Sequence, residues 1–313
     1  MIRGILAALA LLAVPAAAQA PQPNISPAEY LAQHICLDAT ARPIPGMIPH
    51  INPLCSSVAP ARMGVPLTYV TYDWRRGQRG PKRSDSVLTA GPRVVQTFDF
   101  GGEQGWRWGW YDRGQDGGDL ATWDGGQVWY SMTEDGGGGR QWFRFEGCPD
   151  DARGWLLWMG EPRREWSLAN YRHGIARSPD GCPPDYSAVQ TRWRLQPVTL
   201  LWSDGETGGE IVVDAMLTLH FAGGPPEQSW GGEFFVHARH LGRVAWGAFF
   251  SHERDANAQQ RWVDRWWAIH TDQRCPGMEA QIMGLIPGNH TLSDCRLYTQ
   301  FRAEAALPME WPR

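Results

Sequence analysis

The chain has 313 residues and a formal net charge of −4, with 42% hydrophobic and 20% charged residues. This is a globular composition, large enough for one big domain or two small ones. The slightly acidic balance argues against nucleic acids and anionic membrane surfaces as partners. Eighteen tryptophans are the unusual count, and codon bias is too weak an explanation for them.

The first twenty residues have the pattern of a signal peptide. Arg3 supplies the positive start, an apolar run follows from Ile5 to Val14, and small residues precede cleavage after Ala18 or Ala20. No later stretch reaches about 18 uncharged apolar residues, so no membrane span is expected. The sequence therefore predicts a periplasmic or secreted protein.

Residues 21–66 are expected to form an N-terminal helix and a proline-rich arm. Ser26 is a potential N-cap, Pro27 occupies the first helical position, and Glu29 completes a capping box. We expect a helix from Pro27 to about Cys36. Four prolines between residues 42 and 53 exclude regular helix or central strand after it, so this arm should run extended over the main body.

Six cysteines lie after the predicted leader. An even count in an exported chain indicates disulfides, whereas zinc sites need closely spaced pairs that this sequence lacks. The count alone does not fix the pairing. We favour bridges between sequence neighbours, each enclosing a loop-like stretch: Cys36–Cys55, Cys148–Cys182 and Cys275–Cys295.

Residues 67–313 carry β signals. A hairpin is indicated around Asp124–Gly126, another turns near Leu241 and Gly242, and residues 189–195 alternate between apolar and polar. No long helical period separates the strands. We expect an all-β fold, an antiparallel two-sheet β-sandwich of jelly-roll or concanavalin-like type. A β-propeller is the alternative, although the tryptophans do not recur at a fixed interval.

Three tryptophans between residues 106 and 110 are candidates for the protein core. Alternate residues of a strand point to the same side, so Trp106, Trp108 and Trp110 should share one face. The opposite face offers Arg107, Gly109 and Tyr111, which are poor core material. We therefore expect these three indoles to be buried.

The strands predicted at 209–221, 233–240 and 261–272 have an apolar stripe on one face and polar or aromatic residues on the other. Sugars combine apolar ring faces with hydroxyl groups, so such a mixture is typical of glycan binding. The predicted ligand-binding residues are Asp214, His220, Phe235, His237, Arg239, Asp264, Trp266 and His270. The competing interpretation is a second core layer, covered for example by the N-terminal arm.

Catalytic motifs are missing. The sequence contains no G-x-S-x-G elbow, no H-E-x-x-H and no P-loop. A lyase hypothesis would use Arg239 to neutralise a uronate, His237 as the base and Tyr111 as the acid. No cofactor and no metal are predicted. Two weaker alternatives are a transition metal at His220, His237 and His270, and structural calcium at Asp112, Asp116 and Asp119.

These observations favour an exported glycan-binding protein with a polysaccharide or oligosaccharide partner, with or without cleavage. The alternative is a non-catalytic structural or protein-interaction module of the cell envelope, in which all aromatic residues are core. Exposure of Phe235 and Trp266 distinguishes the two hypotheses.

Overall fold

The computed structural model describes part of the chain. The described residues are 27–31, 34–42, 44, 49–50, 53–60, 67–73, 78–84, 87–90, 93–97, 118–124, 126–135, 139–148, 154–178, 180–203, 208–251, 286 and 288–303. Within them the structure is all-β and antiparallel, with one four-residue helix. The predicted fold class is confirmed at this level.

Fourteen strands form one sheet in the order β4-β3-β16-β15-β14-β13-β12-β11-β9-β8-β7-β6-β5, with β10 paired to β8. The earlier strands are β3 (Leu67–Asp73), β4 (Gln78–Ser84), β5 (Val87–Ala90), β6 (Arg93–Thr97), β7 (Gly118–Asp124), β8 (Gln127–Asp135) and β9 (Gly139–Phe145). The later ones are β10 (Trp155–Met159), β11 (Ser167–Ala176), β12 (Ser187–Ser203), β13 (Gly208–Ala222), β14 (Gly231–Ala238), β15 (Gly242–Ser251) and β16 (His290–Ala303).

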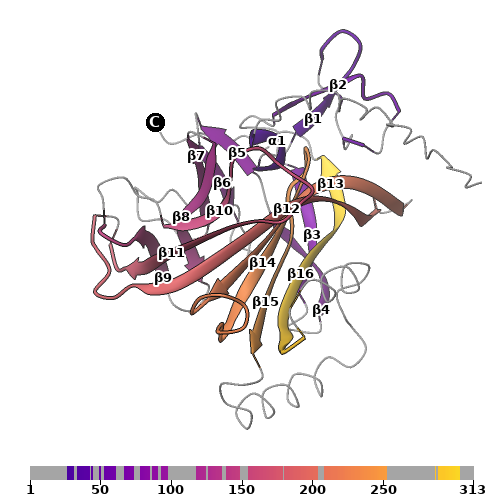
Figure 1. Ribbon diagram of the computed structural model, residues 1–313. Helices are drawn as coiled ribbons and strands as arrows, with labels where there is room; N and C mark the ends of the chain where they lie inside the picture. Colours follow the sequence, from indigo (N-terminus) through magenta and orange to yellow (C-terminus); the bar gives the residue numbers. More distant parts are fainter. Residues whose placement is uncertain are drawn as a thin grey trace, which may run out of the picture.

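The N-terminal segment forms a short helix and a second, two-stranded sheet. It consists of helix α1 (Ala28–Leu31) and the antiparallel pair β1 (His34–Leu37) and β2 (Ser57–Pro60). Figure 1 shows this unit at one end of the long strands β12 to β16, which fan out side by side. The helix is shorter than predicted, because His34 N–H donates to His240 O at 2.9 Å and the chain becomes extended before Cys36.

The two predicted hairpins are present. Asp124 pairs with Gln127 across a two-residue turn between β7 and β8, where Gly126 has a φ of 79°, a value that glycine adopts without strain. Strands β14 and β15 are joined through Arg239, His240 and Leu241, the turn predicted near Leu241. Turn chemistry thus places both hairpins correctly.

The sheet is curled. Strand β12 contacts β16 although three strands lie between them in the hydrogen-bonded order. On the other side, β10 lies across β12 and β13, where Thr191 Oγ1 donates to Leu156 O at 3.1 Å and Thr218 Oγ1 donates to Leu157 O at 3.2 Å. Within the described residues, this continuous sheet does not break into the separate blades that the propeller alternative requires.

The central strands are buried on both faces. In β13 the predicted inward stripe of Ala215, Leu217, Leu219 and Phe221 is buried, and so are Met216 and His220 on the opposite face. Strand β14 repeats the pattern. A strand covered on both sides lies in the interior of a layered structure, so β13 and β14 form the middle of the core.

Strand β12 contains a proline at position 197 that a central strand would not tolerate. Strand β11 pairs with β12 only as far as Trp193, so Pro197 lies on a stretch that is paired with β13 alone. Backbone N–H groups two residues apart point to the same edge, and Leu195 N–H donates outward to Arg163 O. The missing N–H of Pro197 therefore costs no hydrogen bond in the sheet.

Two of the three predicted disulfides are confirmed. Cys36 bonds to Cys55 and Cys148 bonds to Cys182, with Cα separations of 5.1 and 5.6 Å. Cys275 lies outside the described residues, so its bond to Cys295 stays a prediction. No helix among the described residues is long and apolar enough to cross a membrane.

Replacing Cys148 and Cys182 together by serine should lower the free energy of unfolding by about 3–4 kcal/mol. The bridge closes a loop with a sequence separation of 34, and its loss enlarges the entropy of the unfolded chain. Urea unfolding of the wild type and the double variant measures the difference. A change below about 1 kcal/mol would show that this loop is constrained without the bridge.

Candidate functional site

The part of the predicted ligand face that the structure describes lies on strands β13 and β14. Strands β13 and β14 are neighbours, and their register places Met216 opposite His237, Thr218 opposite Phe235 and His220 opposite Glu233. Alternation along β13 adds Asp214 to the same face. The sequence pattern therefore predicted correctly which of these residues share one side of the sheet.

The expectation that this face is exposed is wrong for its central residues on β13 and β14. His220, Phe235 and His237 are 2–3% exposed, because α1 and β10 pack over the face. The cover and the face form one core cluster of Tyr30, Leu31, Val128, Tyr130, Phe143, Leu156, Leu157, Trp158, Trp193, Leu195, Met216 and Phe235. The competing interpretation, a second core layer beneath the N-terminal segment, describes the packing here.

His220 is held in a closed network of polar groups. Its Nδ1 lies 3.0 Å from Thr191 Oγ1 and 3.4 Å from the hydroxyl of Tyr171. Thr191 gives its hydroxyl proton to Leu156 O, so Nδ1 of the neutral imidazole carries the hydrogen and donates to Thr191. Burial, and then nearby His173, lower the pKa of His220 well below its usual range.

His173 and His237 extend the buried imidazole layer. His173 stacks on Phe143, and burial lowers its pKa to about 4. His237 contacts the Trp158 ring at 5.3 Å between centroids and the Tyr130 hydroxyl at 3.5 Å through Nε2. Burial first, and then the charge of Arg243, lower the pKa of His237 to about 3. Neutral imidazoles therefore serve as aromatic core residues.

Arg239 forms an ion pair with Glu29 in the N-terminal segment. Its Nε and Nη2 both donate to Glu29 Oε2 at 2.7 Å, so it does not share an open surface with His237. Asp214 lies 3.6 Å from Arg164 Nη2. The lyase arrangement is therefore not assembled by the described residues, and its third member, Tyr111, lies outside them.

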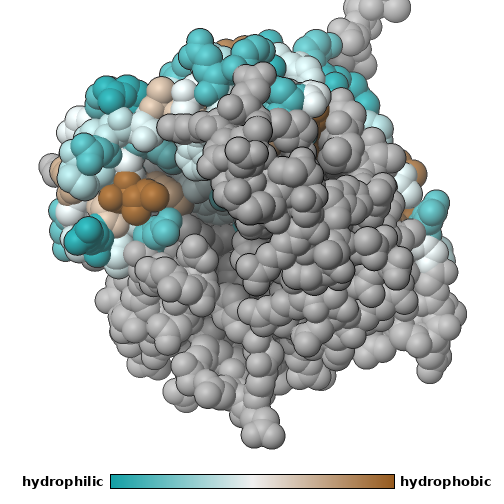
Figure 2. All heavy atoms as spheres, turned by 90° about the horizontal axis from the view of Figure 1, so that it is seen from below, coloured by the Kyte–Doolittle hydropathy of each residue, from teal (hydrophilic) through white to brown (hydrophobic). Residues whose placement is uncertain are grey.

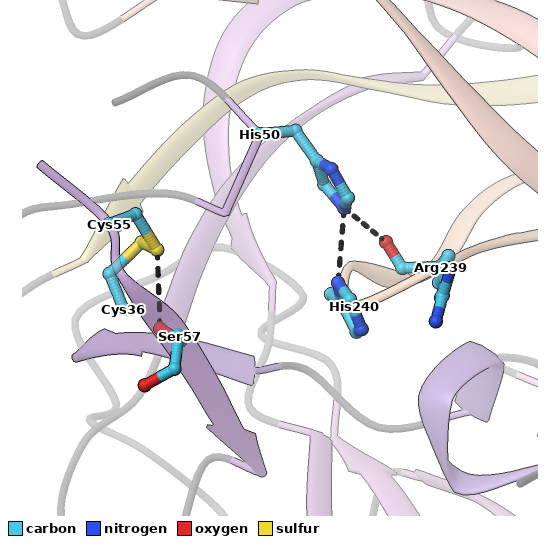
Figure 3. Close-up of a disulfide and its surroundings, with 6 residues drawn as sticks. All are labelled: Cys36, His50, Cys55, Ser57, Arg239 and His240. Atoms are coloured by element: carbon cyan, nitrogen blue, oxygen red, sulfur yellow. Dashed lines mark hydrogen bonds between the residues drawn. A yellow bond between two sulfur atoms is a disulfide. The ribbon is translucent and has the colours of Figure 1, made fainter. Parts of the chain in front are cut away.

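Three histidines gather around the β14–β15 turn, and we call His34, His50 and His240 the histidine latch. His50 Nε2 lies 3.2 Å from His240 Nδ1 and 3.0 Å from the backbone oxygen of Arg239. Figure 3 shows both contacts near the Cys36–Cys55 disulfide. The bridge and the latch together fasten the segment that contains α1 to the turn.

Two histidines of the latch, His50 and His240, have lowered pKa values. Burial, followed by the charges of His34, His50 and Arg239, lowers the pKa of His240 to about 4, and Glu29 acts in the opposite direction. Burial also lowers the pKa of His50. Among the described residues, no group of three or more His, Cys, Asp or Glu side chains is arranged to hold a metal.

Several predicted residues lie outside the part of the chain whose side chains the structure describes. They are the core candidates Trp106, Trp108 and Trp110, the ligand candidates Asp264, Trp266 and His270, and the calcium candidates Asp112, Asp116 and Asp119. The transition-metal alternative shares His270 with this group. These interpretations stay predictions.

Large apolar side chains are exposed at few described positions. They are Leu54, Met159, Trp166, Leu168, Ile175, Val212 and Trp230. In Figure 2, the coloured part of the surface is mostly hydrophilic, and its most prominent hydrophobic patch lies at the left. Two of the residues, Trp166 and Leu168, are neighbours of a polar arrangement on β11 and β12.

Sequence reasoning missed that arrangement, which we call the arginine–amide ladder: Asn170, Gln190, Arg192, Arg194 and Gln196. Asn170 is directly opposite Gln190 in the register. Gln190 Nε2 donates to Asn170 Oδ1 at 2.8 Å, and Arg192 Nε donates to Gln190 Oε1 at 2.6 Å. Arg194 donates to Gln196 Oε1 from Nε at 3.0 Å and from Nη2 at 2.7 Å.

An exposed indole lies at the end of the ladder. Trp166 is 39% exposed, and the guanidinium of Arg194 lies 4.7 Å from its ring centre. Leu168 is opposite Arg192, whose guanidinium lies 5.7 Å from the Phe221 ring. The alternation in "QTRWRLQ" marks the ladder residues as one face, and it is the signal that could have revealed them.

No known family model matches this chain, and neither a curated protein nor a solved structure is significantly similar to it.

Proposed function

We propose that the protein is an exported glycan-binding protein and that the arginine–amide ladder with Trp166 is its binding surface. The observation that supports this proposal is the exposed indole of Trp166. It lies next to amide and guanidinium groups that are held in place by hydrogen bonds between side chains. An indole face packs against the C–H face of a pyranose, while oriented amides and guanidiniums match its hydroxyls.

The ladder is prepared for binding because its side chains are already ordered. Gln190 is buried, whereas Arg192, Arg194 and Gln196 are half-buried. Each arginine is fixed by a neighbouring amide oxygen at hydrogen-bond distance. Binding then loses less side-chain entropy than it would with free arginines, which favours affinity.

The scaffold of this proposal is a two-layer β-sandwich. Its support is the curl that lays β10 over β12 and β13 and brings β12 against β16. Export is proposed from the signal-peptide pattern of residues 1–20, and the two disulfides fit an oxidising compartment. We propose no catalytic step.

A non-catalytic structural or protein-interaction module of the cell envelope is the second candidate function. The observation in its favour is the burial of Phe235, which places that aromatic residue in the core. This candidate expects no glycan to bind at the ladder, so one binding experiment separates the two.

Trp166→Ala should weaken glycan binding by about 1–3 kcal/mol, on the scale of one lost ring-stacking contact. A glycan array identifies the ligand, and affinity electrophoresis then compares the variants. Trp230→Ala removes another exposed indole outside the ladder and is the matched control, which should bind as the wild type does. Equal binding by wild type and Trp166→Ala, or no glycan bound by the wild type, contradicts the proposal.

A further inference from the structure

We infer that the ladder selects acidic glycans, whose carboxylate groups bind Arg192 and Arg194. The inference rests on the proposed glycan-binding function and names the ligand class for that surface. Its basis is the set of partners that these two arginines have, compared with the other arginines of the described structure.

Both ladder arginines have neutral partners only, among the described residues. Arg192 donates to Gln190 and lies over Phe221, and Arg194 donates to Gln196 and lies over Trp166. Neither forms an ion pair with a described carboxylate. Within the part of the chain that the structure describes, no carboxylate neutralises these two positive charges.

Three other arginines of the described structure lie within ion-pair distance of a carboxylate. Arg164 lies near Asp214, Arg172 pairs with Glu146, and Arg239 pairs with Glu29. The whole chain is acidic, with a net charge of −4. Two guanidiniums on one face, without an ion-pair partner among the described carboxylates, therefore form a local positive site rather than part of a general basic surface.

Donor geometry also suits a carboxylate. The hydrogen bonds to the glutamines use Nε of Arg192, and Nε and Nη2 of Arg194. A guanidinium has five N–H donors, so each side chain retains donors on its terminal nitrogens. Positions 192 and 194 are two residues apart in one strand, which separates their backbones by roughly 6.6 Å on the same face. Successive acidic units of one polysaccharide can contact both.

The positive charges of Arg192 and Arg194 favour an acidic glycan over a neutral one. A neutral glycan would use the indole and the amides but would leave two ordered guanidiniums without counter-charge. A carboxylate satisfies them through charge-assisted hydrogen bonds, which are stronger than neutral ones. Binding should accordingly weaken as salt concentration rises.

The test is affinity electrophoresis of the full mature chain in gels that contain defined polysaccharides. Polygalacturonate, alginate and hyaluronan supply carboxylates, while methyl-esterified pectin and galactan serve as neutral counterparts. We expect binding to at least one acidic polymer to be tenfold or more tighter than to the neutral ones. The double variant Arg192→Gln/Arg194→Gln should lose this preference.

Arg42→Gln/Arg177→Gln is the matched control, because it removes the same charge from two exposed positions outside the ladder. It should keep the wild-type preference. Circular dichroism and urea unfolding check that both double variants fold. Equal binding to acidic and neutral polymers overturns the acidic inference and leaves glycan binding in place, whereas binding to none of them overturns both.

Discussion

Trp158→Ala is expected to lower the free energy of unfolding by about 3–5 kcal/mol, the usual cost of truncating a core aromatic residue. The indole is 1% exposed and belongs to the cluster between β10 and the face of β12 to β14. Its removal leaves a cavity that α1, β10 and the sheet would have to fill by moving toward one another. Urea unfolding followed by far-ultraviolet circular dichroism measures the loss.

Trp166→Ala provides the matched comparison, since it removes the same side chain from an exposed position. We expect it to cost less than about 1 kcal/mol. Similar losses in the two variants would show that the layer between α1, β10 and the sheet is not a packed core. A small loss for Trp158→Ala alone would point to the same conclusion.

Stability is expected to fall by several kcal/mol as the pH decreases from about 6.5 toward 4. The pKa values of His173, His237 and His240 are lowered to about 4, 3 and 4 by burial, and that of His220 is lowered as well. In the unfolded chain these groups titrate near 6.5. Between the two values the unfolded state binds more protons, so acid favours unfolding.

Thermal or urea unfolding at pH 7, 5.5 and 4.5 measures this dependence. Each imidazole that is protonated only on unfolding contributes a slope of up to about 1.4 kcal/mol per pH unit. His237→Gln removes one such group and should make the dependence shallower, whatever it does to stability at neutral pH. Stability that stays constant or rises below pH 6 would contradict the burial of neutral histidines.

The fold class and the pairing of β13 with β14 could be predicted because period-two alternation reports the face of each residue. Alternation does not report what covers a face. In β13, both Leu217 and Met216 are fully buried, although they point in opposite directions. The cover comes from α1 and β10, which are far away in sequence and whose docking no local pattern encodes.

Helix length was overestimated for a related reason. A capping box and Pro27 indicate where a helix starts, but its end is set by tertiary contacts. The hydrogen bond from His34 to His240 and the pairing of β1 with β2 require an extended backbone from residue 34 onward. The Cys36–Cys55 bridge was predictable, because two cysteines flanking a proline-rich arm need no knowledge of the rest of the fold.

The ladder escaped prediction because alternating arginines and glutamines are ordinary on an exposed face. What distinguishes it is the absence of carboxylate partners among the described residues and the position of Trp166 over Arg194. Both depend on the strand register between β11 and β12. The sequence shows the residue types, but the register determines which of them meet.

Pro197 also bears on aggregation. Where β12 extends past β11, its free edge could add a strand from another molecule, as unpaired edges of long strands do. The N–H of Leu195 is already donated to Arg163 O, and the next position on that edge is the proline, which has no N–H to offer. An incoming strand would therefore find two consecutive donor positions closed, one by the hydrogen bond to Arg163 and one by the proline ring, and this edge of the β12–β13 hairpin is protected from self-association.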